Sequence, residues 1–236
     1  MFRIILFILL LIVLKSTAQE NGTPLITNYS PDLFNSEPQI WAITQDKRGL
    51  MYFGTSDCIL EFDGTTWRKI YTPKKQVVRS LDIDENGRIY VGSNNNFGYL
   101  ESDSIGSLTY VSISDCLDSS LRKFEDVWKT IVTDDYVYFG CSNYIFRYYP
   151  TNQKPTPSDI EVFKAETSFF LLFKNKNDVY TYQRKKGLSK LCKENIELVK
   201  EGAKIRTWFM LPYPGDKIFI GSMPEGLFVY DPLTKN

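Results

Sequence analysis

Four aromatic residues and one arginine recur at one position of a sequence repeat, and together they have the chemistry of a binding site. Trp41, Arg79, Phe169 and Trp208 each lie thirteen residues before a repeated Gly or Tyr, and Trp128 lies twelve residues before another repeated Gly. Aromatic faces stack on sugar rings, and a guanidinium pairs with carboxylates and hydroxyls. The set predicts a site for a glycan or another small extracellular ligand that is acidic or rich in hydroxyl groups.

Polar residues in the neighbouring loops extend this predicted site. Asn94, Asn95 and Asn96 follow one of the repeated glycines, and Arg206 comes shortly before the last aromatic strand. We expect all four near Arg79, which is predicted to lie at the accessible end of a channel. The alternative is that the large repeated side chains only wedge between neighbouring structural units, which is the commoner role of repeated aromatic residues.

The sequence predicts no catalytic residue, no metal site and no cofactor. It contains no histidine, so imidazole bases, Ser-His and Cys-His pairs and mixed zinc sites are not available. Four carboxylates precede strands of the repeat, but no sequence neighbour marks any of them as an acid or a nucleophile; they are Glu37, Glu125, Asp126 and Glu166. We therefore expect that the protein is not an enzyme. The alternatives are a secreted enzyme that acts on polysaccharide and a passive protein-interaction scaffold.

The elements that must position these residues form a repeat of about forty residues. Its most regular part is a four-residue step of apolar and aromatic residues that ends in glycine: MYFG at 51–54, IYVG at 89–92, VYFG at 137–140 and IFIG at 218–221. A degenerate copy ends at Tyr182. An apolar strand and a tight turn such as DKRG or DENG precede the step, and two further strands follow it. Four antiparallel strands per repeat predict the blades of a β-propeller.

The chain is thus predicted to be an all-β protein with five four-stranded blades, which we expect to belong to a propeller of seven or more blades. The expected blades are 39–75, 76–114, 125–165, 166–201 and 204–236, the last of which is incomplete. A short helical turn is expected only within 114–127. Residues 19–38 form an extension before the first blade, and segment 24–29 is a candidate for the missing outer strand of the last.

The first 18 residues have the pattern of an export signal. Arg3 precedes eleven apolar residues at 4–14, and the small residues Ser16 and Ala18 follow at the spacing of a cleavage site. Eleven apolar residues are too few to span a membrane, which takes about 20. We predict a signal peptide at residues 1–18 and a periplasmic or other extracytoplasmic location for the remainder.

Charge and cysteine content limit the partners and the covalent structure. Basic and acidic residues are equal in number, at 28 each, and no basic run exceeds RKK at 184–186, so nucleic acid is not an expected partner. The four cysteines, which would allow three disulfide pairings outside the cytoplasm, are Cys58, Cys116, Cys141 and Cys192. Two of them follow repeated glycines in apolar or small surroundings, which favours buried free thiols and leaves disulfides as the alternative.

The order of these motifs resembles a known family. The segments IWAITQDKRGLMYFGTSDCILEFDGTTW and VVRSLDIDENGRIYVGSNNNFGYLE, together with the export signal, resemble the two-component-regulator propeller repeats of bacterial extracytoplasmic sensors. They are most similar to the start of those sensors that continue into a triple-tyrosine domain, a membrane helix and a cytoplasmic output module. The resemblance covers residues 24–232 and implies the ligand-sensing domain of a signalling receptor.

The resemblance is incomplete, because no kinase, receiver or DNA-binding segment occurs in the sequence. The expectation is an amino-terminal piece of a longer receptor, which would reach the membrane only through its missing carboxy-terminal part. Dimerisation of the full-length receptor stays open. The alternative to a fragment is a closed ring of five blades.

Overall fold

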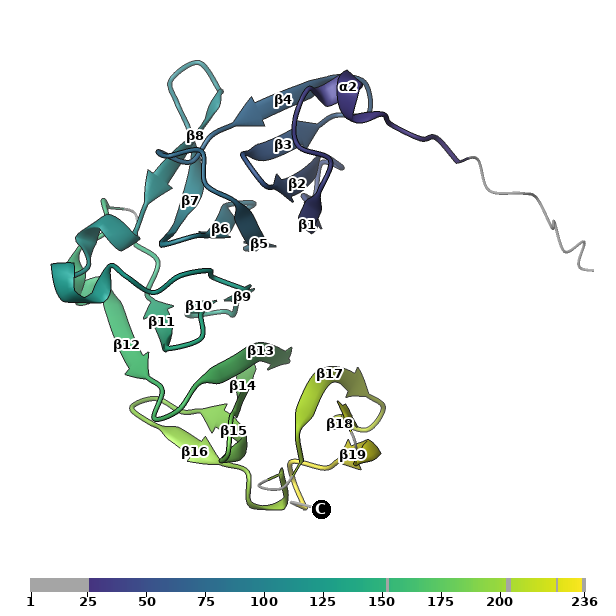
Figure 1. Cartoon of the computed structure of the whole chain (residues 1–236), viewed down its shortest axis with the longest axis vertical. Coiled ribbons are helices and arrows are strands. Elements are labelled where there is room, and N and C mark those ends of the chain that lie inside the picture. The colour runs from purple at the N-terminus through teal and green to yellow at the C-terminus, as the bar shows by residue number, and fades with distance from the viewer. Residues whose placement is uncertain (1–25, 152, 203–204, 224, 235–236) are drawn as a thin grey trace, which may run out of the picture. The chain divides into compact units, whose positions relative to one another are not determined.

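The computed structural model describes residues 26–151, 153–202, 205–223 and 225–234 (Figure 1). The chain divides into two units, residues 1–30 and residues 31–236. In the first unit only residues 26–30 are described, and they contain no helix or strand. The predicted signal peptide lies outside the described residues.

Residues 31–236 form five antiparallel sheets, in each of which the strands are hydrogen-bonded in chain order. We number these sheets as blades 1 to 5. Blade 1 contains β1 (Ile40–Gln45), β2 (Met51–Thr55), β3 (Ile59–Phe62) and β4 (Trp67–Ile70). Blade 2 contains β5 (Val78–Ile83), β6 (Ile89–Ser93), β7 (Asn96–Ser102) and β8 (Leu108–Ser112).

The remaining sheets repeat this order, except that the last has three strands. Blade 3 contains β9 (Lys129–Val132), β10 (Val137–Gly140), β11 (Tyr144–Tyr148) and β12 (Ile160–Lys164). Blade 4 contains β13 (Phe169–Asn175), β14 (Asp178–Gln183), β15 (Gly187–Leu191) and β16 (Ile196–Leu198), and blade 5 contains β17 (Thr207–Tyr213), β18 (Lys217–Ser222) and β19 (Gly226–Tyr230). This is the arrangement of a β-propeller, so the predicted fold class is confirmed.

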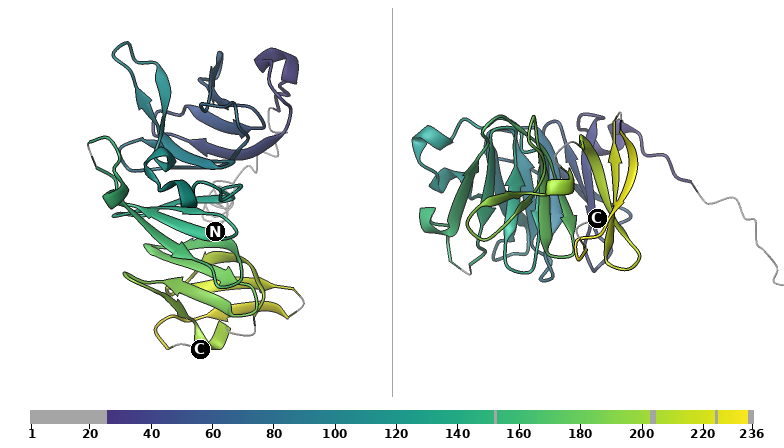
Figure 2. Two further views of the ribbon diagram at one scale, coloured as in Figure 1. Left: turned by 60° about the vertical axis from the view of Figure 1, so that its left-hand side comes forward. Right: turned by 90° about the horizontal axis from the view of Figure 1, so that it is seen from below.

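The first strand of each blade lies next to the first strand of the following blade. Strand β5 is in contact with β1 and β9, and β13 is in contact with β9 and β17. Within residues 31–236 these five inner strands lie on the concave side of the row of blades, and the later strands of each sheet lie further out (Figure 1). Figure 2 shows the same sheets standing side by side in two other views.

The hydrophobic core lies between the sheets and is divided into seams. Blades 1 and 2 enclose one cluster, which includes Tyr52 and Val91, and blades 2 and 3 enclose a larger one that is rich in aromatic rings. In that larger cluster the ring centroids of Phe97 and Phe139 are 4.4 Å apart. Two further clusters join blade 3 to blade 4 and blade 4 to blade 5. Each blade is therefore stabilised mainly by its neighbours, as is usual in repeat proteins.

The repeated glycine provides a contact point within these seams. A Cβ atom added to Gly54 would lie 2.8 Å from Val78 of blade 2, and one added to Gly140 would lie 2.7 Å from Leu172 of blade 4. Both distances are shorter than a carbon-carbon contact allows. The glycine is therefore needed because the inner strand of the next blade packs directly against its backbone.

Short helical segments lie outside the sheets. Within the stretch 114–127, where a helical turn was predicted, two 3-10 turns occur at Ser114–Cys116 and Ser119–Leu121. The helix α2 (Pro31–Phe34) was not predicted. Its Phe34 packs on Trp67 of β4, with ring centroids 5.1 Å apart, and so covers part of the free face of blade 1. The described part of the 19–38 extension thus holds this helix and no strand; residues 24 and 25 lie outside the described residues.

Candidate functional site

β-bulges give the repeated ring position its orientation. In blade 1, Ile40 pairs with Thr55 and Ala42 pairs with Gly54, so Trp41 is an extra residue with no partner on β2. The same register shift leaves Arg79 of β5 and Trp208 of β17 as extra residues. A bulge bends its strand and redirects a side chain out of the regular pleat. We call this end of the inner strands the mouth.

The register corrects one of the predicted residues. In blades 1, 2 and 5 the residue before the repeated glycine pairs with a residue ten positions earlier, but in blade 4 Thr181 pairs with Leu172, nine positions earlier. The hairpin of blade 4 is therefore one residue shorter. Phe169 is consequently buried in the seam, with 5% of its surface exposed, and Phe170 is the aromatic residue at the mouth, with 39% exposed.

Arg79 lies between two tryptophans from the blades on either side. Its guanidinium carbon is 3.8 Å from the centre of the Trp41 ring and 4.7 Å from the centre of the Trp128 ring. The two rings meet edge to face, with centroids 6.5 Å apart. Trp41 is 39% exposed and Trp128 is 43% exposed, whereas only 16% of the Arg79 side chain is exposed. The indole faces therefore form most of the accessible surface here.

A carboxylate and an amide complete this group. The Nε atom of Arg79 donates to Asp126 Oδ2 at 3.0 Å, and Asn94 Nδ2 donates to Asp126 Oδ1 at 2.8 Å. Among the described residues, Arg79 Nη1 is buried without a hydrogen-bond partner. Asp126 belongs to the segment that leads into blade 3, so the ion pair connects blades 2 and 3. Arg79 thus has the charge partner that a buried guanidinium requires, and its contact with a ligand stays a prediction.

The other two predicted asparagines have structural contacts. Asn95 has a positive φ of 49°, and its Oδ1 accepts hydrogen bonds from the backbone N–H groups of Phe124 and Glu125 at 2.9 Å. It therefore holds the loop that brings Asp126 to Arg79. Asn96 is buried, and its Oδ1 accepts hydrogen bonds from Tyr110 and Ser112 on β8. Of the three, only Asn94 joins the group around Arg79.

The structure places the remaining predicted residues in a second group on blades 4 and 5. Trp208 meets Phe170 edge to face, with ring centroids 5.2 Å apart. The Arg206 guanidinium lies 5.9 Å from the centre of the Trp208 ring. Sequence reasoning did not select Phe170 or Arg184, which also lines this part of the mouth. The sequence signal that could have identified Phe170 was a hairpin one residue shorter, as in blade 3, where Trp128 lies twelve residues before the repeated glycine.

The carboxylates considered for catalysis have other partners or stand apart. Asp126 pairs with Arg79, and Glu166 forms an ion pair with Lys186. Glu125 is exposed in the loop before Asp126. In the part of the chain that the structure describes, no group of three or more Cys, Asp or Glu residues is placed to hold a metal ion.

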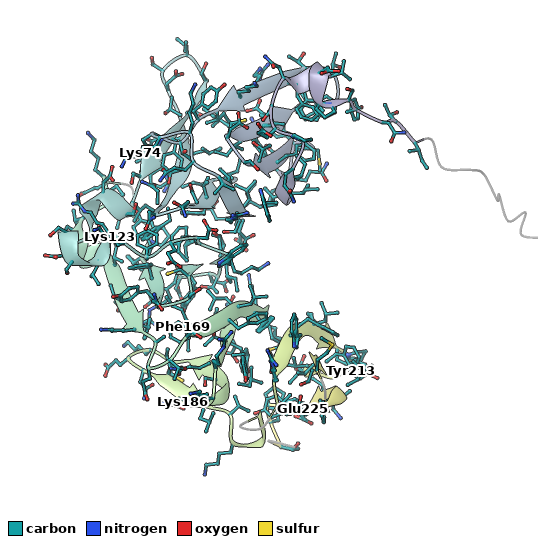
Figure 3. All side chains as sticks on the ribbon, viewed as in Figure 1. Lys74, Lys123, Phe169, Lys186, Tyr213 and Glu225 are labelled. Carbon is teal, nitrogen blue, oxygen red and sulfur yellow. The ribbon has the colours of Figure 1, made fainter. Side chains whose placement is uncertain are left out.

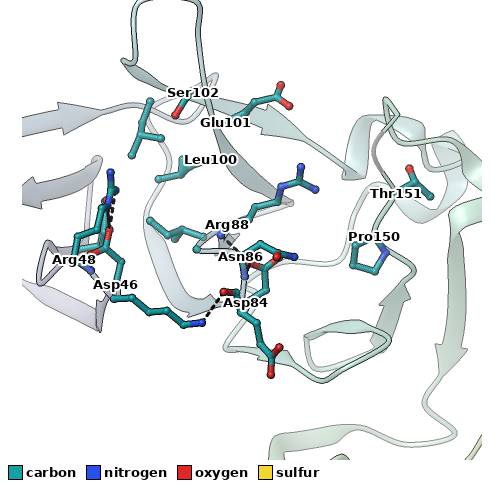
Figure 4. Close-up of a pocket in the computed structure, with 16 residues that line it drawn as sticks. Asp46, Arg48, Asp84, Asn86, Arg88, Leu100, Glu101, Ser102, Pro150 and Thr151 are labelled. Atoms are coloured by element: carbon teal, nitrogen blue, oxygen red, sulfur yellow. Dashed lines mark hydrogen bonds and ion pairs between the residues drawn. The ribbon is translucent and has the colours of Figure 1, made fainter.

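A wide cleft lies at the opposite end of the strands from the mouth. It has a volume of about 800 Å³ and is lined by the first turns of blades 1 and 2 and by part of blade 3 (Figure 4). Asp46 accepts hydrogen bonds there from the N–H groups of Arg48 and Leu50, and Asp84 accepts from Asn86 and Arg88. These carboxylates close their own turns, so we do not assign the cleft to ligand binding.

The four cysteines are free thiols. Burial raises the pKa of Cys141 to about 12 and also raises the pKa of Cys58. Because the thiolate is the reactive form, both groups are protected from oxidation in the folded chain.

Comparisons with known proteins give no match in sequence: no family model and no curated protein matches the chain. In the described residues, no helix is both long and apolar enough to cross a membrane. Structural similarity is clearer. The extracellular domain of BT4673 from B. thetaiotaomicron, whose two structures class it as a one-component and a hybrid two-component system, matches 84% of this chain with a TM-score of 0.59 and 17% identity. This chain covers only 27% of that one.

Other propellers have comparable similarity in fold. Virginiamycin B lyase from Staphylococcus aureus matches 84% of this chain and 72% of its own, with a TM-score of 0.59 and 12% identity. The WD40 propeller domain of Doa1 matches 84% of this chain and 66% of its own, with a TM-score of 0.55 and 9% identity. The prediction that the chain is not an enzyme is therefore contradicted, because an enzyme has this type of fold. At these identities the likeness establishes only the fold, which is a β-propeller. One of the similar structures is the extracellular domain of a two-component system.

Proposed function

We propose that residues 31–236 are the ligand-binding part of an exported sensor and that the mouth binds a glycan. The observation that carries this proposal is the group of Trp41, Arg79 and Trp128. Two indole rings with 39% and 43% of their surface exposed stand at the end of the inner strands, held by a guanidinium between them. Rigid aromatic faces beside hydrogen-bonding groups are suited to the apolar faces and the hydroxyls of a sugar.

The exposure of Trp41 and Trp128 favours binding over simple packing. A guanidinium stacked between the rings fixes both indoles in place, so little conformational entropy is lost when a ligand lies on them. A side chain required only to fill a seam would be buried, as Phe169 is.

The assignment to a sensor rests on three supports of different kinds. The export pattern of residues 1–18 predicts a location outside the cytoplasm. The repeats resemble those of extracytoplasmic sensors. The extracellular domain of BT4673, from a system of that type, has a similar fold. On this basis we infer that this chain is part of a signalling receptor whose output module lies elsewhere in the full-length protein.

Titration calorimetry of the purified protein against a panel of oligosaccharides tests the glycan proposal. We expect at least one oligosaccharide to bind, and we expect Trp41→Ala and Trp128→Ala each to weaken its binding about tenfold or more, which corresponds to about 1.4 kcal/mol. No binding by any oligosaccharide would refute the proposal.

Trp67 provides the matched control. It is the tryptophan that lies away from the mouth, where it stacks on Phe62 with centroids 4.1 Å apart. Trp67→Ala is expected to lower the thermal midpoint and to leave the affinity unchanged. Equal loss of affinity in this variant would mean that the tryptophans at the mouth act only through folding.

A further inference from the structure

The mouth contains a second pair of exposed aromatic rings on blades 4 and 5. Phe170 and Trp208 are each 39% exposed and lie at the bulges of the adjacent inner strands β13 and β17. They meet edge to face, so their outer faces offer two surfaces at an angle of 67°. In position on the strand this pair corresponds to Trp41 and Arg79 in blades 1 and 2.

The charged residues beside Phe170 and Trp208 differ from the Arg79–Asp126 ion pair beside Trp41 and Trp128. Arg184 and Arg206 line the same part of the mouth, and both are exposed. Among the described residues, neither forms an ion pair. The nearby carboxylate of Glu225 accepts a hydrogen bond from Ser222, and its pKa is lowered by that bond and, to a lesser extent, by the charge of Arg206.

Backbone hydrogen bonds fix the segments that carry the two arginines. The N–H of Arg184 donates to the Ser168 carbonyl at 2.9 Å, and the Thr167 hydroxyl donates to the Arg184 carbonyl at 2.5 Å. The carbonyl of Arg206 accepts from the Ser222 hydroxyl at 2.8 Å. The backbone of both arginines is thus fixed beside this part of the mouth, which both side chains line. Figure 3 labels Phe169, Lys186 and Glu225 in this part of the molecule.

A buried hydroxyl group also lies at this position. Thr207, between Arg206 and Trp208, is fully buried, and in the described part of the chain its Oγ1 has no hydrogen-bond partner. The hollow that it lines has a volume of only about 20 Å³, enough for a single water molecule. The hollow is too small for a sugar ring, so a ligand would rest on the aromatic faces above it.

We infer that blades 4 and 5 form a second subsite, which takes a negatively charged sugar residue of the glycan. The sugar ring lies against Trp208 and Phe170, and its carboxylate or sulfate lies between the guanidinium groups of Arg184 and Arg206. Planar guanidinium groups bind such anions through paired hydrogen bonds, and this geometry distinguishes them from lysine. The inference rests on the proposed function, because it names the class of glycan.

The contrast with blades 1 to 3 supports the choice of an anion. There the guanidinium of Arg79 is neutralised by Asp126 at 3.0 Å, so that half of the mouth has no preference for charge. On blades 4 and 5 the same aromatic surface is accompanied by two arginines that form no ion pair among the described residues, although the Glu225 carboxylate lies near Arg206. A glycan that spans both halves would place a neutral unit on Trp41 and Trp128 and an acidic unit on Trp208.

The test compares acidic oligosaccharides with their neutral forms. The probes are oligosaccharides of polygalacturonate, alginate, chondroitin sulfate and heparin, each beside a carboxyl-reduced and, where relevant, desulfated counterpart. We expect at least one acidic probe to bind tenfold or more tightly than its neutral form, with an affinity that falls as the salt concentration rises. Arg184→Gln and Arg206→Gln should each remove most of this preference and leave binding of the neutral form unchanged.

Lys186→Gln is the matched control, because Lys186 carries the same charge in the same loop but pairs with Glu166. It should retain the preference. Binding of neutral and acidic forms with equal affinity, or a preference that survives both arginine substitutions, would overturn the inference and leave the proposed function standing, provided that Trp41→Ala still weakens binding. Absence of binding by every probe in either form would overturn both.

Discussion

We call the space beside each repeated glycine, where a Cβ atom would lie, the glycine socket. The sockets of the first blades and the socket of blade 5 have the same backbone, but different atoms fill them. A Cβ at Gly92 would meet Val127 and Thr130 of the following blade at 2.6 and 2.9 Å. The three atoms nearest to a Cβ at Gly221 all belong to the ring of Phe209, which lies in the same blade as Gly221. The space that an inner strand fills between neighbouring blades is filled in blade 5 by a side chain of its own sheet.

This difference separates two functions of the repeated step. The strand and its glycine recur in blade 5, where no further sheet packs against the glycine among the described residues. The seam requires a second blade, because its core is made of side chains from two sheets. Blade 5 therefore leaves an apolar face exposed, which is formed by Phe209, Leu211, Tyr213, Leu227 and Val229.

Among the repeated glycines, the largest effect is expected from filling a socket within a seam. Gly92→Ala places a methyl group against Val127, Thr130 and Ser80, and overpacking of this kind should lower the free energy of unfolding by about 2–3 kcal/mol. Gly221→Ala is the matched variant, for which we expect less than about 1 kcal/mol because the Phe209 ring is 40% exposed and can rotate away. Urea unfolding measures both; equal losses would show that the sockets are equivalent.

Arg147 joins blades 3 and 4 through a set of polar contacts that we call the clasp. Loss of the clasp should have the next largest effect on stability. The Arg147 side chain is 2% exposed, and its guanidinium donates to Glu161 on β12 and to the carbonyl groups of Cys192 and Lys193 in blade 4. Arg147→Met removes hydrogen bonds from a charged donor and should lower the free energy of unfolding by about 2 kcal/mol. Arg68→Met is the comparison, because the exposed Arg68 pairs with Glu61 within blade 1. If both variants lose the same stability, the clasp does not depend on the seam.

Cys141 reports the seam between blades 2 and 3 through its ionisation. Burial raises its pKa from 9.0 to about 12, so the unfolded chain loses this proton at a lower pH than the folded chain. The stability due to the neutral thiol is therefore complete below pH 9.0 and is lost as the pH rises toward 12. At pH 10 the loss relative to pH 7 should be about 1 kcal/mol smaller in Cys141→Ala than in the unmodified protein. Identical alkaline losses would place the thiol in contact with water.

The smallest effect on stability is expected at the free face of blade 5. Leu227 is 68% exposed, so Leu227→Lys should change the free energy of unfolding by less than about 0.5 kcal/mol. The same change at Leu60, a fully buried residue of blade 1, should prevent folding. Because exposed apolar sheets promote association, Leu227→Lys should also reduce self-association in analytical ultracentrifugation. Unchanged self-association would mean that the exposed apolar face of blade 5 is not the surface through which the chains associate.

The sequence was sufficient for the fold because the blades are local. Turn residues such as Asp46 and Gly49 close a hairpin within a few positions, and the apolar step recurs in every blade. It was less informative about the mouth. The partner of Arg79 is Asp126, 47 positions away, and no repeat pattern relates the two. Phe169 was predicted at the mouth in place of Phe170 because the first hairpin of blade 4 is one residue shorter. In that blade Tyr182 also replaces the repeated glycine from which the positions were counted.

The bulges on the inner strands have a consequence for how binding preference can change. Trp41, Arg79 and Trp208 are extra residues without a cross-strand partner, so their side chains are not constrained by the pairing that holds each blade together. An indole and a guanidinium already occupy equivalent positions in neighbouring blades. Exchange at Trp41 or Trp208 alters the chemistry of the mouth without breaking a cross-strand pair, so under the proposed function one scaffold can acquire new specificities by single substitutions.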